Sequence, residues 1–126
     1  MVTWITGKAG AGKSTLAREM IQRYKREDKP AVWLDGETLR TIQDNDFSDE
    51  GRRSNVMFAA KLAAVLEGQG FYVVVSMVSP YDKVREEAFK LLHHVVVVYV
   101  KGGKLWPGTT YEEPDGKRGF VYDWRE

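Results

Sequence analysis

A glycine-rich segment near the start of the chain has the composition of a phosphate-binding loop. Gly7, Gly12, Lys13 and Ser14 fit the pattern G-x-x-x-x-G-K-[ST], between a short apolar run and an amphipathic stretch. In that setting the backbone N–H groups curl around phosphate oxygens, and the helix N-terminus adds positive potential. We therefore predict a site for ATP with Mg²⁺, formed by consecutive residues: Gly7, Lys8, Ala9, Gly10, Ala11, Gly12, Lys13, Ser14 and Thr15.

Three side chains of this segment have distinct expected roles. Lys13 is predicted to bridge the β- and γ-phosphates, Ser14 to place its hydroxyl on Mg²⁺, and Thr15 to lie near the α-phosphate. An ordinary glycine-rich turn is the alternative, and the strand-like and helix-like flanks argue against it.

Asp35 is the candidate catalytic carboxylate. It ends "AVWLD", an apolar run that leads directly into an acidic residue. Parallel sheets bind ligands at the carboxyl ends of their strands, so Asp35 is expected to face the γ-phosphate. There it would accept a proton from an attacking alcohol, or hold Mg²⁺ through water. The alternative is that Asp35 only caps the helix that follows.

Residues that suit a planar, anionic acceptor follow Asp35. Arg40 and Arg52 supply two guanidinium groups, Phe47 an aromatic ring and Asn55 an amide. Arginine binds phosphate or sulfate oxygens in pairs, and a phenyl ring can stack on a base. Each residue alone would be an ordinary surface or core group, so this hypothesis requires that they lie together.

Hydrophobic patterning predicts the elements that position these groups. Continuous apolar runs indicate strands at residues 2–6, 31–34, 71–76 and 95–100, with a final strand at 119–122. Helical spacing indicates helices from residue 13 to before Pro30 and over 37–42, 52–67 and 81–92, while residues 44–51 are expected to form a loop. Strands buried on both faces and separated by helices predict one α/β domain over residues 1–126. Its expected architecture is a three-layer P-loop NTPase fold with a parallel sheet of four or five strands flanked by helices.

Composition narrows the function. The 19 basic and 18 acidic residues give a net charge of +1, so no general field favours nucleic acid. The absence of cysteine excludes disulfides, thiol catalysis and iron–sulfur clusters. No apolar run approaches the ~20 residues of a membrane helix, so we expect a soluble, cytoplasmic protein. Without an N-K-x-D guanine signature, and with a length too short for a motor ATPase, the chain is best interpreted as a kinase.

Four segments together resemble the adenylylsulfate kinase family. "GKAGAGKSTLA", "LDGETLR", "FSDEGRRSN" and "VVVSMVSPY" occur in that family's order and spacing. The resemblance implies transfer of the γ-phosphate of MgATP to the 3′-hydroxyl of adenylyl sulfate, with Asp35 as the catalytic carboxylate. It also implies that Met77 and Val78 line the acceptor pocket beside the residues named above, and that Ser79 matches a serine that some members phosphorylate.

The resemblance is incomplete in three places. Gly51 stands where the family has Asp, and Val56-Met57-Phe58 replace Ile-Arg-Arg. The family's mobile lid is replaced after Lys101 by "GGKLWPGTTYEEP", which we interpret as a deletion. An open site would admit water unless a second copy in a homodimer, or a bulky substrate, closes it.

Two alternatives therefore remain open. One is a compact kinase for an alcohol in a larger substrate, such as a hydroxymethylated DNA base or a polynucleotide end, with a basic patch formed by Lys8, Arg52, Arg53, Lys83, Arg85 and Lys104. The other is a nucleotide-binding regulator without turnover, which the presence of both Lys13 and Asp35 disfavours.

Trp106 is a further candidate, for stacking on adenine where the lid would have been.

Overall fold

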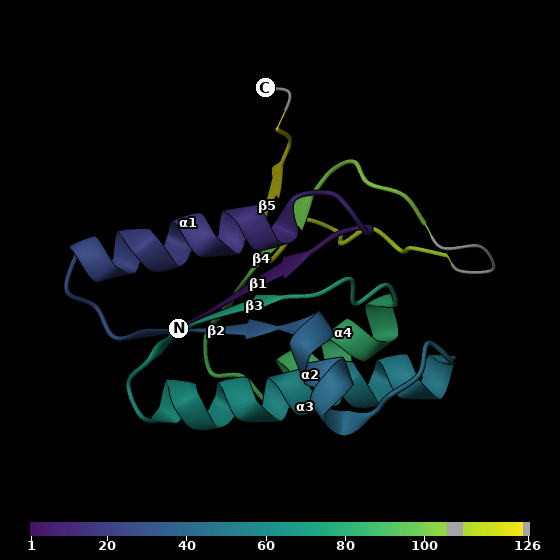
Figure 1. Ribbon diagram of the computed structural model, residues 1–126, viewed down its shortest axis with the longest axis horizontal. Helices are drawn as coiled ribbons and strands as arrows, with labels where there is room; N and C mark the ends of the chain where they lie inside the picture. The colour runs from purple at the N-terminus through teal and green to yellow at the C-terminus, as the bar shows by residue number, and fades with distance from the viewer. Residues whose placement is uncertain (106–109, 125–126) are drawn as a thin grey trace.

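The computed structural model describes residues 1–105 and 110–124, which form a parallel sheet between two layers of helix (Figure 1). The strand order is β2-β3-β1-β4-β5, and every neighbouring pair is parallel. The strands are β1 (Val2–Thr6), β2 (Ala31–Asp35), β3 (Tyr72–Ser76), β4 (Val95–Val100) and β5 (Gly119–Tyr122). This arrangement confirms the predicted fold, including the fifth strand.

The helices divide unequally between the two faces of the sheet. Helix α1 (Lys13–Arg26) covers one face, whereas α2 (Gly36–Gln43), α3 (Asp49–Gly68) and α4 (Asp82–Phe89) lie on the other (Figure 1). Of the helices formed by residues 1–105 and 110–124, none has the length and apolar character needed to cross a bilayer.

Burial on both faces explains the continuous apolar strands. On β3, Val73 and Val75 pack into the cluster beneath α3 and α4, while Val74 between them packs beneath α1. Trp4 and Ile5 divide between the same two clusters on β1. Successive side chains of a strand point to opposite faces, so a strand covered on both sides needs no polar residues.

The start of α3 differs from the prediction. The helix begins at Asp49, whereas residues 44–51 were expected to form a loop. Ser48 explains the earlier start, because its side-chain oxygen accepts a hydrogen bond from Gly51 N at 3.0 Å. Helix α4 is also shorter than the expected 81–92 and ends at Phe89.

The stretch between β4 and β5 folds back over the phosphate loop. Lys104 N donates to Ala9 O at 2.8 Å, and Glu112 N donates to Pro80 O at 2.8 Å. The Tyr111 hydroxyl lies 2.7 Å from Thr6 Oγ1 at the end of β1. The described residues of this stretch therefore form a wall beside the carboxyl edge of the sheet.

Candidate active site

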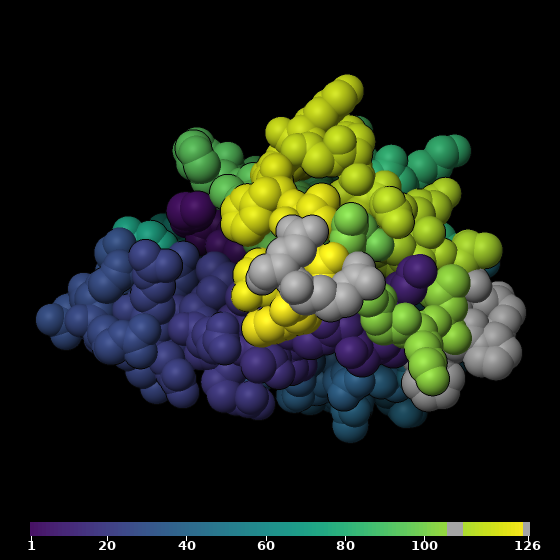
Figure 2. All heavy atoms as spheres, turned by 90° about the horizontal axis from the view of Figure 1, so that it is seen from above, coloured from purple at the N-terminus to yellow at the C-terminus, as the bar shows by residue number. Residues whose placement is uncertain are grey.

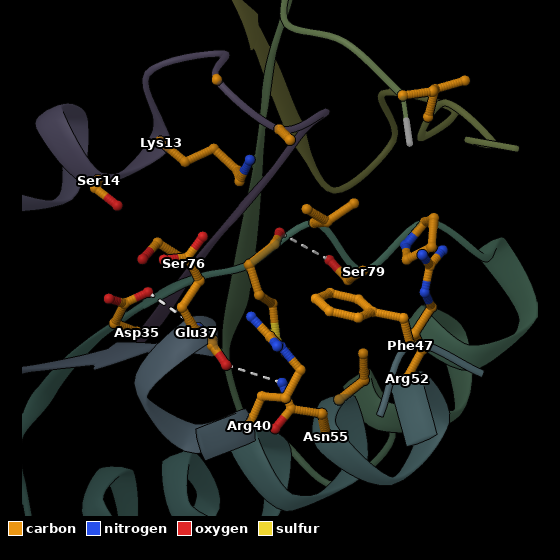
Figure 3. Close-up of a pocket in the computed structure, with 18 of the residues that line it drawn as sticks. Lys13, Ser14, Asp35, Glu37, Arg40, Phe47, Arg52, Asn55, Ser76 and Ser79 are labelled. Carbon is orange, nitrogen blue, oxygen red and sulfur yellow. Dashed lines mark hydrogen bonds between the residues drawn. The ribbon is translucent and has the colours of Figure 1, made fainter. Parts of the chain in front are cut away.

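A cavity of about 380 Å³ lies at the carboxyl edge of the sheet (Figure 3). It unites most of the residues predicted for the two halves of the site: Ala9, Gly10, Gly12, Lys13, Ser14, Thr15, Asp35, Arg40, Phe47, Arg52, Asn55, Met77, Val78 and Ser79. Gly7, Lys8 and Ala11 are not in its walls and instead shape the loop. Lys104, Leu105 and Thr110 of the returning stretch also line it.

Glycine is required at particular points of the loop. Gly10 and Gly12 have φ values of 77° and 100°, in the left-handed region that side chains disfavour. At Gly7, a Cβ atom would lie 2.6 Å from Val100 O on the neighbouring strand. The loop therefore adopts a curl that most other residues would strain.

Lys13 is the first residue of α1, and its side chain reaches back over this loop into a partly desolvated position. Its Nζ donates to Lys8 O at 2.7 Å. Burial lowers the pKa of Lys13 from 10.5 to about 8, and the nearby charges of Glu37 and Asp35 offset part of that effect. A phosphate group at this point would supply the negative charge that the buried ammonium lacks.

Asp35 both caps a helix and faces the cavity. One carboxylate oxygen accepts from Glu37 N at 3.3 Å and the other from Thr38 Oγ1 at 3.4 Å, which makes Asp35 the N-cap of α2. The same side chain lines the cavity together with Lys13 and Ser14. The two interpretations offered for Asp35 are thus compatible, because the cap fixes the carboxylate at the edge of the sheet.

Glu37 is a site residue that the sequence argument missed. Glu37 lines the cavity. Its negative charge raises the pKa of Lys13, and this effect is larger than the effect of the Asp35 charge on the same lysine. Figure 3 shows its side chain beside Ser76 in the same part of the cavity as Lys13. The available signal was the spacing in "LDGE", which places a second carboxylate in the first turn of the helix that Asp35 caps.

The expected acceptor residues meet on the other side of the cavity. The Arg40 guanidinium carbon lies 4.1 Å from the centroid of the Phe47 ring, and that of Arg52 lies 5.9 Å from it. Asn55 Nδ2 donates to Gly36 O at 2.9 Å (Figure 3). Its Oδ1 is buried and has no hydrogen-bond partner within the described residues, so it presents an acceptor for a polar ligand group.

Ser79 is buried beside the cavity, with its hydroxyl already engaged. It is 3% exposed and has a φ of 40°, in the left-handed region. Its Oγ accepts from Trp4 Nε1 at 3.1 Å and lies 3.1 Å from Thr6 Oγ1 and 3.2 Å from Met77 O. Phosphorylation of Ser79 stays a prediction, and it would require this network to open.

The basic patch expected for nucleic acid loses two of its members. Arg85 is 1% exposed and donates to Ser79 O at 2.6 Å and to Glu112 O, which ties the loop after β3 to the returning stretch. Arg53 is paired with Glu87 through two hydrogen bonds. Arg85 is therefore withdrawn from the surface, and Arg53 would have to leave Glu87 to contact a phosphate backbone. Trp106, which is predicted to stack on adenine, lies outside the described residues.

Comparison with known proteins gives a consistent result. The family model for adenylylsulphate kinase matches residues 1–115. The adenylyl-sulfate kinase of Gloeothece citriformis is 36% identical over 99 residues, which are 77% of this chain and 56% of that protein. The cytidine diphosphoramidate kinase of Campylobacter jejuni is 31% identical over 101 residues, 79% of this chain and 59% of that protein. The chain thus spans little more than half the length of these relatives.

A solved structure shows the same fold. The Mycobacterium tuberculosis APS kinase CysC, in complex with AMPPNP and APS, superposes with a TM-score of 0.88 at 20% identity. The superposition covers 99% of this chain and 88% of that one. The arrangement of sheet, loop and helices is therefore shared.

Proposed function

Because the chain belongs to the adenylylsulfate kinase family, we propose that it transfers the γ-phosphate of ATP to the 3′-hydroxyl of adenylyl sulfate. The observation that carries this proposal is the single cavity in which the phosphate loop, Asp35 and the Arg40–Phe47 pair meet. A nucleotide-binding regulator would have no need of a second binding surface facing the γ-phosphate.

The donor half of the cavity suits MgATP. The backbone N–H groups of the loop and the Lys13 ammonium would hold the triphosphate. Ser14 offers a hard oxygen ligand of the kind that Mg²⁺ prefers, and Asp35 would hold the ion through water; both residues line the cavity. When bound, Mg²⁺ would neutralise charge that develops on the phosphate oxygens.

Asp35 is placed to take the proton of the acceptor. In the proposed step, the acceptor oxygen forms a bond to the γ-phosphorus while the bond to the β-phosphate oxygen breaks, and the hydroxyl proton passes to the Asp35 carboxylate. The hydrogen bonds from Glu37 N and Thr38 Oγ1 orient that carboxylate. ADP and the phosphorylated alcohol are the products.

The acceptor half suits a nucleotide with an anionic tail. We propose that Phe47 stacks on its base and that Arg40 and Arg52 bind its phosphate or sulfate oxygens. Asn55 would accept a hydrogen bond through its unpartnered Oδ1. Met77 and Val78 provide the apolar wall.

A second nucleotide acceptor is the next candidate. The Campylobacter jejuni relative is named for a cytidine compound, so nucleotides other than adenylyl sulfate belong in the same test. A polynucleotide acceptor is less favoured, because Arg85 is buried and Arg53 is paired.

Labelled ATP offered with a panel of acceptors tests this proposal. The panel contains adenylyl sulfate, a cytidine diphosphate derivative, hydroxymethylated DNA and a 5′-hydroxyl oligonucleotide. We expect label in adenylyl sulfate, and Arg40→Ala should raise the KM for that acceptor much more than the KM for ATP. Label in DNA alone, or in no acceptor, would contradict the proposal.

A further inference from the structure

The order of the strands fixes the direction in which a phosphate donor must lie. Arg40 is on α2, Phe47 lies just before α3, and both stand on the side of β1 where β3 and β2 lie. In phosphoryl transfer the attacking and leaving oxygens are roughly in line through the phosphorus. A donor whose γ-phosphate faces these residues therefore extends away from them, across β1 and toward the carboxyl ends of β4 and β5.

An aromatic side chain stands at that end. Trp124 lies two residues after the end of β5, and its indole packs so closely on the loop that a Cβ atom at Gly12 would overlap Trp124 Nε1. The Tyr122 ring supports the indole in an edge contact, with ring centroids 4.8 Å apart. Figure 2 shows the yellow C-terminal segment lying against the purple loop and the start of α1.

The indole is nevertheless not enclosed. Trp124 is 40% exposed, although it touches the segment that would hold the phosphates. An exposed indole beside a phosphate site offers a flat apolar surface to the next part of a bound nucleotide, which is the base. Nucleobases stack on aromatic side chains whatever their hydrogen-bonding edge, because every base has a π-face.

We propose that Trp124 is the stacking surface for the base of the phosphate donor. The family model matches residues 1–115, so Trp124 lies beyond the residues that it matches. The inference rests on the proposed function only in requiring that a nucleoside triphosphate binds in the phosphate loop. Because stacking does not distinguish base edges, ATP and GTP should depend on Trp124 to a similar degree.

Isothermal titration calorimetry with three magnesium-loaded probes tests the inference on the full chain. ATP and GTP carry a base, whereas inorganic tripolyphosphate occupies the loop without one. For Trp124→Ala we expect ATP and GTP to bind about 5- to 150-fold more weakly. Tripolyphosphate affinity should be unchanged.

Three further variants separate stacking from support of the loop. Trp124→Phe keeps an aromatic face and should retain most of the ATP affinity, whereas Trp124→Leu keeps only apolar bulk and should behave like Trp124→Ala. Phe120→Ala is the matched control, because Phe120 is an exposed aromatic residue on β5 itself. It should leave the affinity for all three probes at the wild-type value.

Two results would overturn the inference. Equal weakening of ATP and tripolyphosphate by Trp124→Ala would mean that the indole only supports Gly12, and an unchanged ATP affinity would mean that it contacts no base. The proposed kinase function fails separately. If the wild-type protein binds ATP but phosphorylates no acceptor, the kinase proposal is wrong. Calorimetry still decides whether Trp124 contacts the base, because it compares the binding of ATP and tripolyphosphate and needs no turnover.

Discussion

Replacement of Lys13 by methionine should stabilise the nucleotide-free protein while abolishing nucleotide binding. Burial lowers the pKa of Lys13 from 10.5 to about 8. At about 1.4 kcal/mol per pKa unit, the charged side chain destabilises the folded state by about 3 kcal/mol at neutral pH. Methionine keeps the apolar stem and removes this cost, but it also removes the hydrogen bond to Lys8 O, worth about 1 kcal/mol. The expected net gain is about 2 kcal/mol, or about 6 °C in Tm for a chain of this size.

The pH dependence gives the sign of the effect. Between pH 8 and 10.5 the unfolded wild-type chain binds more protons at this lysine than the folded chain, so the contribution of Lys13 to stability rises with pH in that window. The advantage of Lys13→Met should therefore shrink from about 2 kcal/mol near pH 7 to about zero near pH 9.5.

Thermal and urea unfolding of wild type and Lys13→Met, each measured near pH 7 and near pH 9.5, checks the predicted difference in stability. Lys25→Met, at an exposed position of α1, is the matched control and should show no such gain. With MgATP the order should reverse, because only wild type gains stability from the ligand. A Lys13→Met protein that is less stable than wild type without nucleotide, or whose advantage grows with pH, would refute the reasoning.

Other variants probe the remaining parts of the site and its support. Asp35→Asn should keep ATP binding by calorimetry but lower turnover about 10²- to 10⁴-fold, and wild-type turnover would remove the role assigned to Asp35. Arg85→Met should lower the free energy of unfolding by about 3 kcal/mol in urea titrations, because the buried carbonyl oxygen of Ser79 and the partly buried one of Glu112 lose their donor; a loss below 0.5 kcal/mol would contradict this. Gly51→Ala should cost about 1–3 kcal/mol, because its Cβ would overlap Asp46 O, and a variant as stable as wild type would show that this turn yields easily.

The phosphate loop and the sheet could be predicted from the sequence because both depend on local pattern. The glycines of the loop and the apolar residues of the strands can each be recognised from the local sequence. Strand β2 ends in Asp35, so this residue lies at the carboxyl edge of a parallel sheet whichever strands are its neighbours. The expectation that Arg40 and Phe47 lie together also required only that the segment between two helices be short, and the structure adds a direct contact between the two side chains.

Other parts of the site depended on contacts that sequence spacing does not reveal. Glu37 reaches the cavity because Asp35 caps the first turn of α2, and the early start of α3 depends on the Ser48 hydroxyl. The contact of Trp124 with Gly12 could not be predicted, because no local pattern places a residue after β5 against a loop more than a hundred positions earlier. A contact between segments so far apart in the sequence depends on the order of the strands in the sheet.

A single-turnover assay tests the central claim, which is that one cavity brings the γ-phosphate of ATP to an acceptor alcohol. Enzyme in excess over γ-labelled ATP would be mixed with Mg²⁺ and adenylyl sulfate, and the label partitioned between 3′-phosphoadenylyl sulfate and inorganic phosphate. The account predicts that most of the label enters the acceptor in the wild-type protein. Label recovered only as inorganic phosphate, with adenylyl sulfate present at saturation, would contradict it.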